Sequence, residues 1–187
     1  MKQTLILIIA LSFSISAHGS GSFKARPSQS ERPVTKETSR RQSSAPCAGN
    51  QLSVRHLSED AAMGGHRSID YAFTNTSSSP CTLFGYPRFE LLNKSGRHLG
   101  RVRVVNSNQL PGQEEKQPPR LVRLEPNQKA WFRVYYNSGG AGYIGKPCPA
   151  AARVRIAAPG AKRAFILRDE IQSCRQVEVS AVRSEQP

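Results

Sequence analysis

The chain has 187 residues, enough for one domain with tails or at most a tight pair, and this length excludes a longer array of domains. Hydrophobic residues make up 37%, below the roughly 45–50% of an average globular protein, but much of the deficit lies in one polar segment near the start. The net charge of +14, from 27 basic and 13 acidic residues, indicates either a solvated basic surface or attraction to an acidic partner such as envelope lipid, anionic polysaccharide or nucleic acid. Charge alone does not choose among these.

Residues 1–19 have the layout of a secretory signal peptide. Lys2 precedes an almost wholly apolar run from Leu5 to Ser16, and small residues follow it. This run of twelve residues is too short for a membrane-spanning helix, which needs about 20. We therefore predict cleavage after Gly19 or after Ala17, a secreted or periplasmic location, and no transmembrane segment in the mature protein.

Residues 20–46 are rich in Ser, Pro, Arg, Lys, Thr and Gln and poor in residues that could form a core. Such a composition cannot offset the entropy of ordering the chain, so we predict a disordered basic linker. It serves either as a solvated spacer or as a tether to an anionic surface.

From residue 47 the composition changes, and apolar residues alternate with polar ones. This pattern predicts a folded domain over residues 47–183, followed by a short tail at 184–187. The clearest strand is Arg67–Thr74, where Ile69, Tyr71 and Phe73 share one parity and polar residues share the other. A polar turn, Asn75–Pro80, ends it. The other predicted extended segments, in chain order, are Leu52–Leu57, Phe89–Leu92, Leu99–Val105, Leu121–Leu124, Ala130–Tyr136, Arg153–Ala157, Ala164–Leu167 and Val177–Val182.

The connections between these segments carry turn residues. We predict a loop at Ser58–Gly65, a hairpin turn at Gly96, a long mobile loop at Asn106–Arg120 and a glycine-rich loop at Asn137–Pro149. Short strands at this spacing, without a long helix, predict an all-β fold: an immunoglobulin-like β-sandwich of antiparallel strands. Within Ala130–Tyr136, the buried face is expected to carry Phe132, Val134 and Tyr136.

The four cysteines are Cys47, Cys81, Cys148 and Cys174. An even count behind a signal peptide predicts two structural disulfides, and no Cys-x-x-Cys spacing supports zinc. Sequence alone leaves three pairings open. Cys47 precedes the first predicted strand and Cys174 the last. If these two strands run parallel side by side, as in some immunoglobulin-like sandwiches, the favoured pairs are Cys47–Cys174 and Cys81–Cys148.

A specific segment of the chain is Asn75-x-Ser77 followed by Cys81-Thr-Leu-Phe-Gly-Tyr-Pro87, and it is accompanied by Gly64-Gly65-His66 and Leu124-Glu125-Pro126-Asn127. With these segments the chain resembles the family of exported bacterial proteins known as domain-of-unknown-function family four-two-three-two. The resemblance covers Cys47 to about Val182. It departs at Asn127, where the family has glycine, but Asn also tolerates the left-handed conformation. The resemblance implies an exported bacterial β-sandwich and transfers no catalytic residues.

The sequence contains no complete motif for catalysis or for cofactor binding. Gly140–Lys146 has the spacing of a phosphate-binding loop, but Pro147 stands where a hydroxyl should bind magnesium, and Cys148-Pro149 prevents a helix from starting there. Tyr143 and Lys146 remain candidate contact residues of that loop. The histidines lack metal-ligand spacing and no Gly-x-Ser-x-Gly elbow is present. We therefore predict no catalytic residue, no metal and no cofactor.

Arg101, Arg103, Arg153 and Arg155 alternate with apolar residues on two predicted strands. If those strands are neighbours, the four arginines form one basic face, which either blunts sheet edges against aggregation or binds an anionic polymer. No stripe of aromatic residues accompanies them, so specific nucleic-acid binding is not expected.

The function expected from these observations is a non-catalytic binding or interaction domain of the bacterial cell envelope. Its partner is unknown, with an anionic envelope component or another envelope protein as candidates. The alternatives are a cell-envelope enzyme with an unrecognised site and a purely structural envelope protein.

Overall fold

The computed structural model describes residues 44–139 and 147–184, which belong to one compact unit. The predicted signal peptide, the predicted linker up to residue 43, and Tyr143 and Lys146 lie outside the described residues. Nearly all regular structure is β. The strands are β1 (Leu52–Ala62), β2 (His66–Asn75), β3 (Cys81–Leu83), β4 (Arg88–Leu92), β5 (Val104–Ser107), β6 (Val122–Leu124), β7 (Lys129–Asn137), β8 (Ala150–Ala151), β9 (Arg153–Ala157), β10 (Phe165–Leu167), β11 (Ile171–Gln172) and β12 (Val177–Ser180), with 3₁₀ turns η1 (Gly49–Gln51) and η2 (Met63–Gly65).

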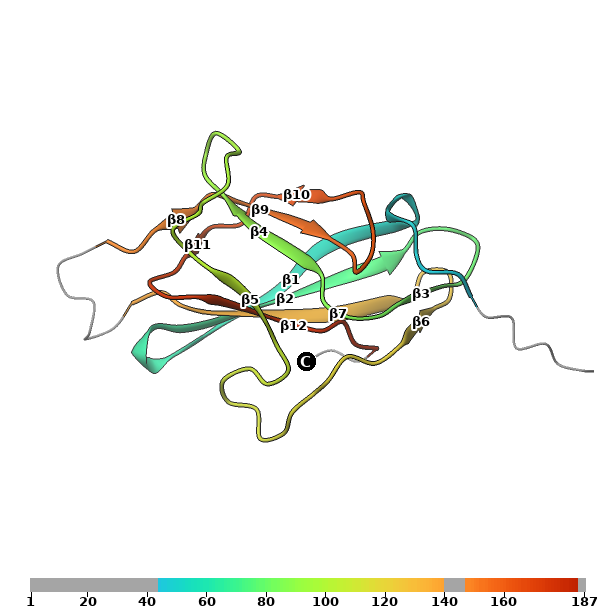
Figure 1. Ribbon diagram of the computed structural model, residues 1–187, viewed down its shortest axis with the longest axis horizontal. Helices are drawn as coiled ribbons and strands as arrows, with labels where there is room; N and C mark the ends of the chain where they lie inside the picture. The colour runs from blue at the N-terminus through green and yellow to red at the C-terminus, as the bar shows by residue number, and fades with distance from the viewer. Residues whose placement is uncertain (1–43, 140–146, 185–187) are drawn as a thin grey trace, which may run out of the picture. The chain divides into compact units, whose positions relative to one another are not determined.

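The strands form one large sheet that faces several smaller ones (Figure 1). The large sheet has the order β1-β2-β7-β12-β5, and a three-stranded sheet has the order β10-β9-β4. Two short pairs, β11-β8 and β3-β6, complete the fold. Every strand pair is antiparallel except β12 with β5, which is parallel. The all-β sandwich predicted from the sequence is confirmed, with one parallel pair at the edge of the large sheet.

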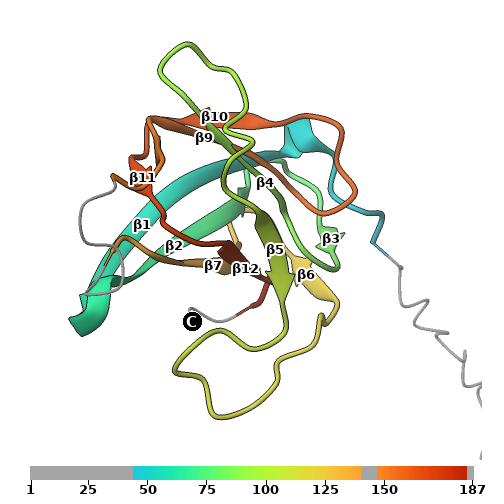
Figure 2. The ribbon, with the colours of Figure 1, turned by 60° about the vertical axis from the view of Figure 1, so that its left-hand side comes forward.

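The core lies between the two layers, with β9 and β10 above β1, β2 and β7 in Figure 2. The Tyr71 ring on β2 stacks on Phe132 of β7 at 5.2 Å and meets Phe89 of β4 at 5.9 Å. Aromatic pairs at such distances stabilise a fold by about 0.5–1.5 kcal/mol beyond the burial of their area. Phe132, Val134 and Tyr136 are buried, as their alternation predicts.

Two strands differ in length from the sequence prediction. β1 does not end at Leu57 but continues to Ala62, through residues predicted as a loop, because they pair with β2 as far as His66. A register shift between His56 and Ser58 interrupts this hairpin. β5, in contrast, begins only at Val104, so the predicted strand Leu99–Val105 is mostly a turn.

The β1–β2 hairpin closes through a glycine that no other residue could replace without strain. Gly65 has φ +77°, and a Cβ at that position would lie 1.9 Å from the carbonyl oxygen of Gly139. The Ser138 N–H donates to the Gly65 carbonyl at 2.8 Å. Close approach and left-handed backbone together require glycine here.

The disulfides join Cys47 to Cys81 and Cys148 to Cys174, so the pairing favoured from the sequence is wrong. That pairing assumed that β1 and β12 run parallel side by side. Instead, β2 and β7 separate them, and each successive pair in β1-β2-β7-β12 is antiparallel. β1 and β12 therefore run in opposite directions and begin at opposite ends of the sheet.

Each disulfide staples one end of the large sheet. The Cys47 N–H donates to the Thr82 carbonyl at 2.9 Å, beside Cys81, and the Cys174 N–H donates to the Asn137 carbonyl at 2.9 Å, where β7 ends. The bridges span 34 and 26 residues. Loops of that length correspond to about 3–4 kcal/mol per bridge in the chain-entropy model.

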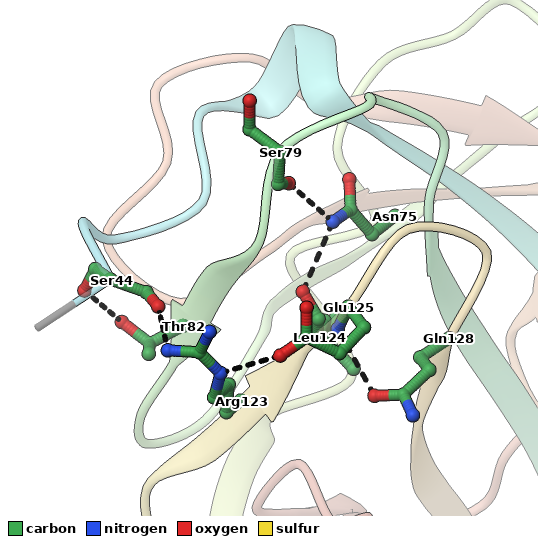
Figure 3. Close-up of polar contacts among 8 residues, drawn as sticks. All are labelled: Ser44, Asn75, Ser79, Thr82, Arg123, Leu124, Glu125 and Gln128. Carbon is green, nitrogen blue, oxygen red and sulfur yellow. Dashed lines mark hydrogen bonds and ion pairs between the residues drawn. The ribbon is translucent and has the colours of Figure 1, made fainter. Parts of the chain in front are cut away.

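Asn75, the first residue of the segment that carries the family resemblance, is fully buried and uses every polar group it has. Its side-chain N–H groups donate to the carbonyls of Ser79 and Leu124 at 2.9 and 3.1 Å (Figure 3), and its Oδ1 accepts from the N–H and hydroxyl of Ser77. Its backbone N–H donates to the Gln128 carbonyl, and its carbonyl accepts from Asn127. Asn75 thus ties the turn before β3 to the β6–β7 turn.

The β6–β7 turn confirms the expectation for Asn127, which has φ +66°. Asparagine reaches this left-handed region at a lower cost than most residues. The turn therefore survives the replacement of the family's glycine.

In the part of the chain that the structure describes, no helix has the length and apolarity needed to cross a membrane.

We predict that Asn75→Asp destabilises the protein by about 2–4 kcal/mol. The carboxylate cannot donate to the carbonyls of Ser79 and Leu124, and it places a charge in a buried site. Urea unfolding of purified protein measures the change. Asn93→Asp is the matched control, because the Asn93 side chain only accepts hydrogen bonds, from Ser95 and Arg97, and should change stability by less than about 0.5 kcal/mol. Equal effects of the two substitutions would contradict the role given to Asn75.

Candidate functional site

The connection from β5 to β6, which we call the 108–121 loop, lies on the side of the large sheet away from β4, β9 and β10 (Figures 1 and 2). Hydrogen bonds brace it: the Gln117 N–H donates to the Asn108 carbonyl at 2.6 Å, and the Gln113 side chain accepts from the Leu110 N–H at 3.0 Å. Leu110 is only 2% exposed. The loop, which the sequence predicts to be mobile, is therefore anchored on the outer face of the sheet.

A groove of about 370 Å³ opens between this loop and the sheet, and we call it the loop groove. Its floor and walls come from three strands and the first part of the loop. The lining residues are Asp60, Ala61, Ala62, His66, Arg67, Ser68, Leu110, Pro111, Gly112, Gln113, Arg133 and Tyr135. Small apolar residues of β1 and loop residues Leu110 and Pro111 make one part apolar, while His66, Arg133 and Tyr135 present polar groups.

An ion pair beneath the groove holds one of its walls. Arg133 of β7 donates through two nitrogens to both carboxylate oxygens of Asp70 on β2, at 2.7 and 2.8 Å. Ser58 of β1 donates to the same carboxylate at 3.3 Å. Asp70 is only 3% exposed, so its charge depends on these partners. The hydrogen bond to Asp70 is the main cause that raises the pKa of Arg133 above its ordinary value.

His66 and Tyr135 lie at one end of the groove and touch each other. Their rings stack at 5.8 Å, and His66 Nδ1 is hydrogen-bonded to the Tyr135 hydroxyl. Burial, followed by the charge of Glu178, raises the pKa of Tyr135. Beyond this pair lies a second hollow of about 500 Å³, which also borders Arg175 and Glu178. The pair therefore lines both hollows, the loop groove and this second one.

The loop groove has the size and lining of a ligand-binding site. Ligand pockets measure roughly 300–1,000 Å³ and combine apolar walls with a few polar groups. Across the described ranges 44–139 and 147–184, no group of three His, Cys, Asp or Glu side chains is placed to hold a metal ion. The groove combines a concave apolar surface with hydrogen-bonding side chains, some basic and one acidic.

A second polar cluster joins the two layers. Both carboxylate oxygens of Asp169, which follows β10, are engaged at 2.9 Å, one by His56 of β1 and the other by the hydroxyl of Tyr71 on β2. Tyr71 is fully buried, and burial with the Asp169 charge raises its pKa above the ordinary range. Because every acceptor atom of the carboxylate side chain is occupied by the opposite sheet, the cluster acts as a link between layers.

The structure divides the four arginines predicted as a basic face. Arg101 and Arg103 precede β5, which pairs only with β12, whereas Arg153 and Arg155 lie on β9, which pairs with β4 and β10. Arg155 forms an ion pair with Glu90 at 2.9 Å, and Arg103 donates to Gln176 at 2.9 Å. The strands that should have been neighbours belong to different sheets. A role for these residues as a surface for an anionic partner stays a prediction.

Sequence reasoning missed the loop groove, because its residues come from three segments, at 60–68, 110–113 and 133–135, that are far apart in the sequence. One signal was present. Leu110 is the sole aliphatic side chain in the polar stretch from Asn106 to Arg120. A single large apolar residue in such a loop indicates a contact that pins the loop to the body of the domain.

The sequence profile of the family described as Domain of unknown function (DUF4232) matches residues 47–184. The searches of curated proteins and of solved structures found no significant match.

We predict that Asp70→Asn destabilises the protein by about 2–4 kcal/mol, because the guanidinium of Arg133 loses its carboxylate in a largely buried site. Glu90→Gln is the matched control. It removes the carboxylate from Arg155 in a pair whose side chains remain 28% and 37% exposed, and should cost less than about 1 kcal/mol. Thermal and urea unfolding measure both changes. A loss for Asp70→Asn no larger than that for Glu90→Gln would show that the ion pair does not support the groove.

Proposed function

The chain belongs to the family described as Domain of unknown function (DUF4232), and we propose that it is a non-catalytic binding domain exported to the bacterial cell envelope. The observation that carries the proposal is the loop groove, a preformed hollow on the outer face of a five-stranded sheet. A site built on paired strands and closed by a braced loop needs little ordering when a partner binds, so less of the interaction free energy is lost.

Two features support export. The first nineteen residues have the charge and apolar pattern of a signal peptide, and all four cysteines are joined in disulfides. Disulfides persist in the periplasm and outside the cell, whereas thiols in the cytosol are kept reduced. The resemblance to exported bacterial proteins agrees with both.

The chemistry of the loop groove favours a partner with mixed apolar and polar character. His66, Arg67 and Arg133 supply cationic or donor groups, and Asp60 supplies a carboxylate, so no single charge sign dominates. Ala61, Ala62, Leu110 and Pro111 supply apolar contact. A segment of another envelope protein combines both kinds of group and fits this lining better than a uniformly anionic polymer.

The export step predicts a defined N-terminus. Protein recovered from its native source should begin at Ser20, or at His18 if cleavage follows Ala17, and should contain no free thiol. Intact-mass measurement with and without reduction checks both points. Residues 1–19 still attached, or four alkylatable cysteines, would overturn the proposed location.

The binding role predicts capture that depends on the loop groove. Ala62 lies exposed on β1 and lines the groove, so Ala62→Trp should fill the hollow without disturbing the core. Ile166→Trp adds a similar bulk at an exposed position of β10, on the other sheet, and is the control. In pull-downs from envelope extract at low and high salt, wild type and Ile166→Trp should retain the same partner and Ala62→Trp should lose it. Retention by all three, or by none, would refute the proposal.

A further inference from the structure

A further hollow, of about 520 Å³ and distinct from the two described above, lies between the later part of the 108–121 loop and the chain after β12. Three cationic side chains line it: Lys116 and Arg120 from the loop, and Arg183 from the segment that follows β12. We call it the cationic hollow. Glu115 is the one carboxylate among its described lining residues, so its formal charge is strongly positive.

Arg183 is held in place by its backbone. Its N–H donates to the Trp131 carbonyl and its carbonyl accepts from the Trp131 N–H, both at 2.8 Å. The preceding N–H, of Val182, donates to the Gly85 carbonyl at 3.0 Å. The guanidinium therefore projects from a fixed stretch of chain beside the edge of the sheet, and its position does not depend on a flexible tail.

The electrostatics of Arg183 are unfavourable for a residue with a structural role. Burial is the main cause that lowers its pKa below the ordinary value, and the charge of Arg120 lowers it further. Some basic side chains in this fold have a carboxylate opposite them, as Arg133 has Asp70 and Arg155 has Glu90. Arg183 forms no such pair with any residue that the structure describes.

Two buried polar atoms at the cationic hollow also have no hydrogen-bond partner among the described residues. They are Nε of Arg183, a donor, and Oε1 of Gln117, an acceptor. A buried polar atom without a partner destabilises a fold, so native proteins keep few of them. Because these two atoms are closed off from solvent, an anionic ligand in the hollow would be bound through the other N–H groups of Arg183, which lines it.

We propose that the cationic hollow binds the phosphate group of a phosphorylated ligand through Lys116, Arg120 and Arg183. A phosphate monoester carries a charge of about −1.5 to −2 at pH 7. This charge balances three cations and one carboxylate better than a single carboxylate group would. Guanidinium groups match phosphate oxygens with two parallel hydrogen bonds, which gives the site geometric preference as well as attraction.

The site is separate from the loop groove, with which it shares Gln113 as a lining residue. It also differs from the four arginines that the sequence analysis singled out. The proposal therefore goes beyond the function proposed above, and either one can fail while the other stands.

The experiment titrates glycerol 3-phosphate and inorganic phosphate into the purified protein and follows binding by calorimetry and by the rise in Tm that a ligand of the native state produces. Arg183→Gln and Arg120→Gln should each weaken binding by about 10- to 100-fold, the effect of losing a hydrogen bond to a charged group. Arg120 is exposed on the loop, so its replacement leaves the fold intact. Arg97→Gln removes an exposed arginine outside the hollow and should bind like wild type.

A second arm separates the two sources of such a phosphate group. Phosphatidylcholine vesicles with and without phosphatidic acid test a lipid headgroup, and the soluble phosphates test a free ligand. Binding in either arm that requires Arg120 and Arg183 supports the site and identifies its source. Binding in neither arm, or an equal loss with Arg97→Gln, would overturn the proposal. Without ligand, Arg183→Gln should have a Tm equal to or above that of wild type, because the repulsion from Arg120 is removed; a clear drop would indicate a structural role instead.

Discussion

One end of the large sheet depends on a buried amide, that of Asn75. β2 ends at this residue, and the turn that leads to β3 belongs to no strand ladder. The Asn75 side chain fixes this turn by bonding forward to Ser77 and Ser79 and across to Leu124. Aspartate lacks the two donors, and glutamine would place its amide one methylene further out. The identity of the residue is therefore dictated by donor count and reach.

The same junction explains why the disulfide map matters for function. Cys47–Cys81 fixes the end of the sheet that Asn75 organises, and Cys148–Cys174 fixes the other, where β7 ends and the chain approaches β12. Between the two disulfides, β1, β2, β7 and β12 lie side by side as successive neighbours in the large sheet. The loop groove and the cationic hollow both use residues from these strands or from segments joined to them. Clamping the sheet ends therefore supports sites whose walls come from distant parts of the chain.

Much of the strand layout could be read from the sequence because burial on one face leaves a period of two, as in β7 and β9. The second half of β1 was not predicted, because it pairs with β2 without burying a face. Residues such as Glu59 and Asp60 are therefore typical of a loop in the sequence. The disulfide pairing could not be predicted correctly, because it depends on strand order, which no local sequence pattern encodes. The groove escaped for the same reason: Asp70 and Arg133 are ordinary polar positions until the register of β2 against β7 places them opposite each other.

The net charge of the chain illustrates the limit of composition as a guide to function. Part of the charge on this domain is neutralised locally, since Arg123, Arg133 and Arg155 each face a carboxylate within 3 Å. Such pairs shape the fold and offer little net attraction to a partner. Arg120 and Arg183 are the opposite case, because burial and then the charge of Arg120 lower the pKa of Arg183, and neither forms an ion pair with a described carboxylate. The position of a basic side chain relative to carboxylates, rather than the count of basic residues, is therefore the better guide to where an anion would bind.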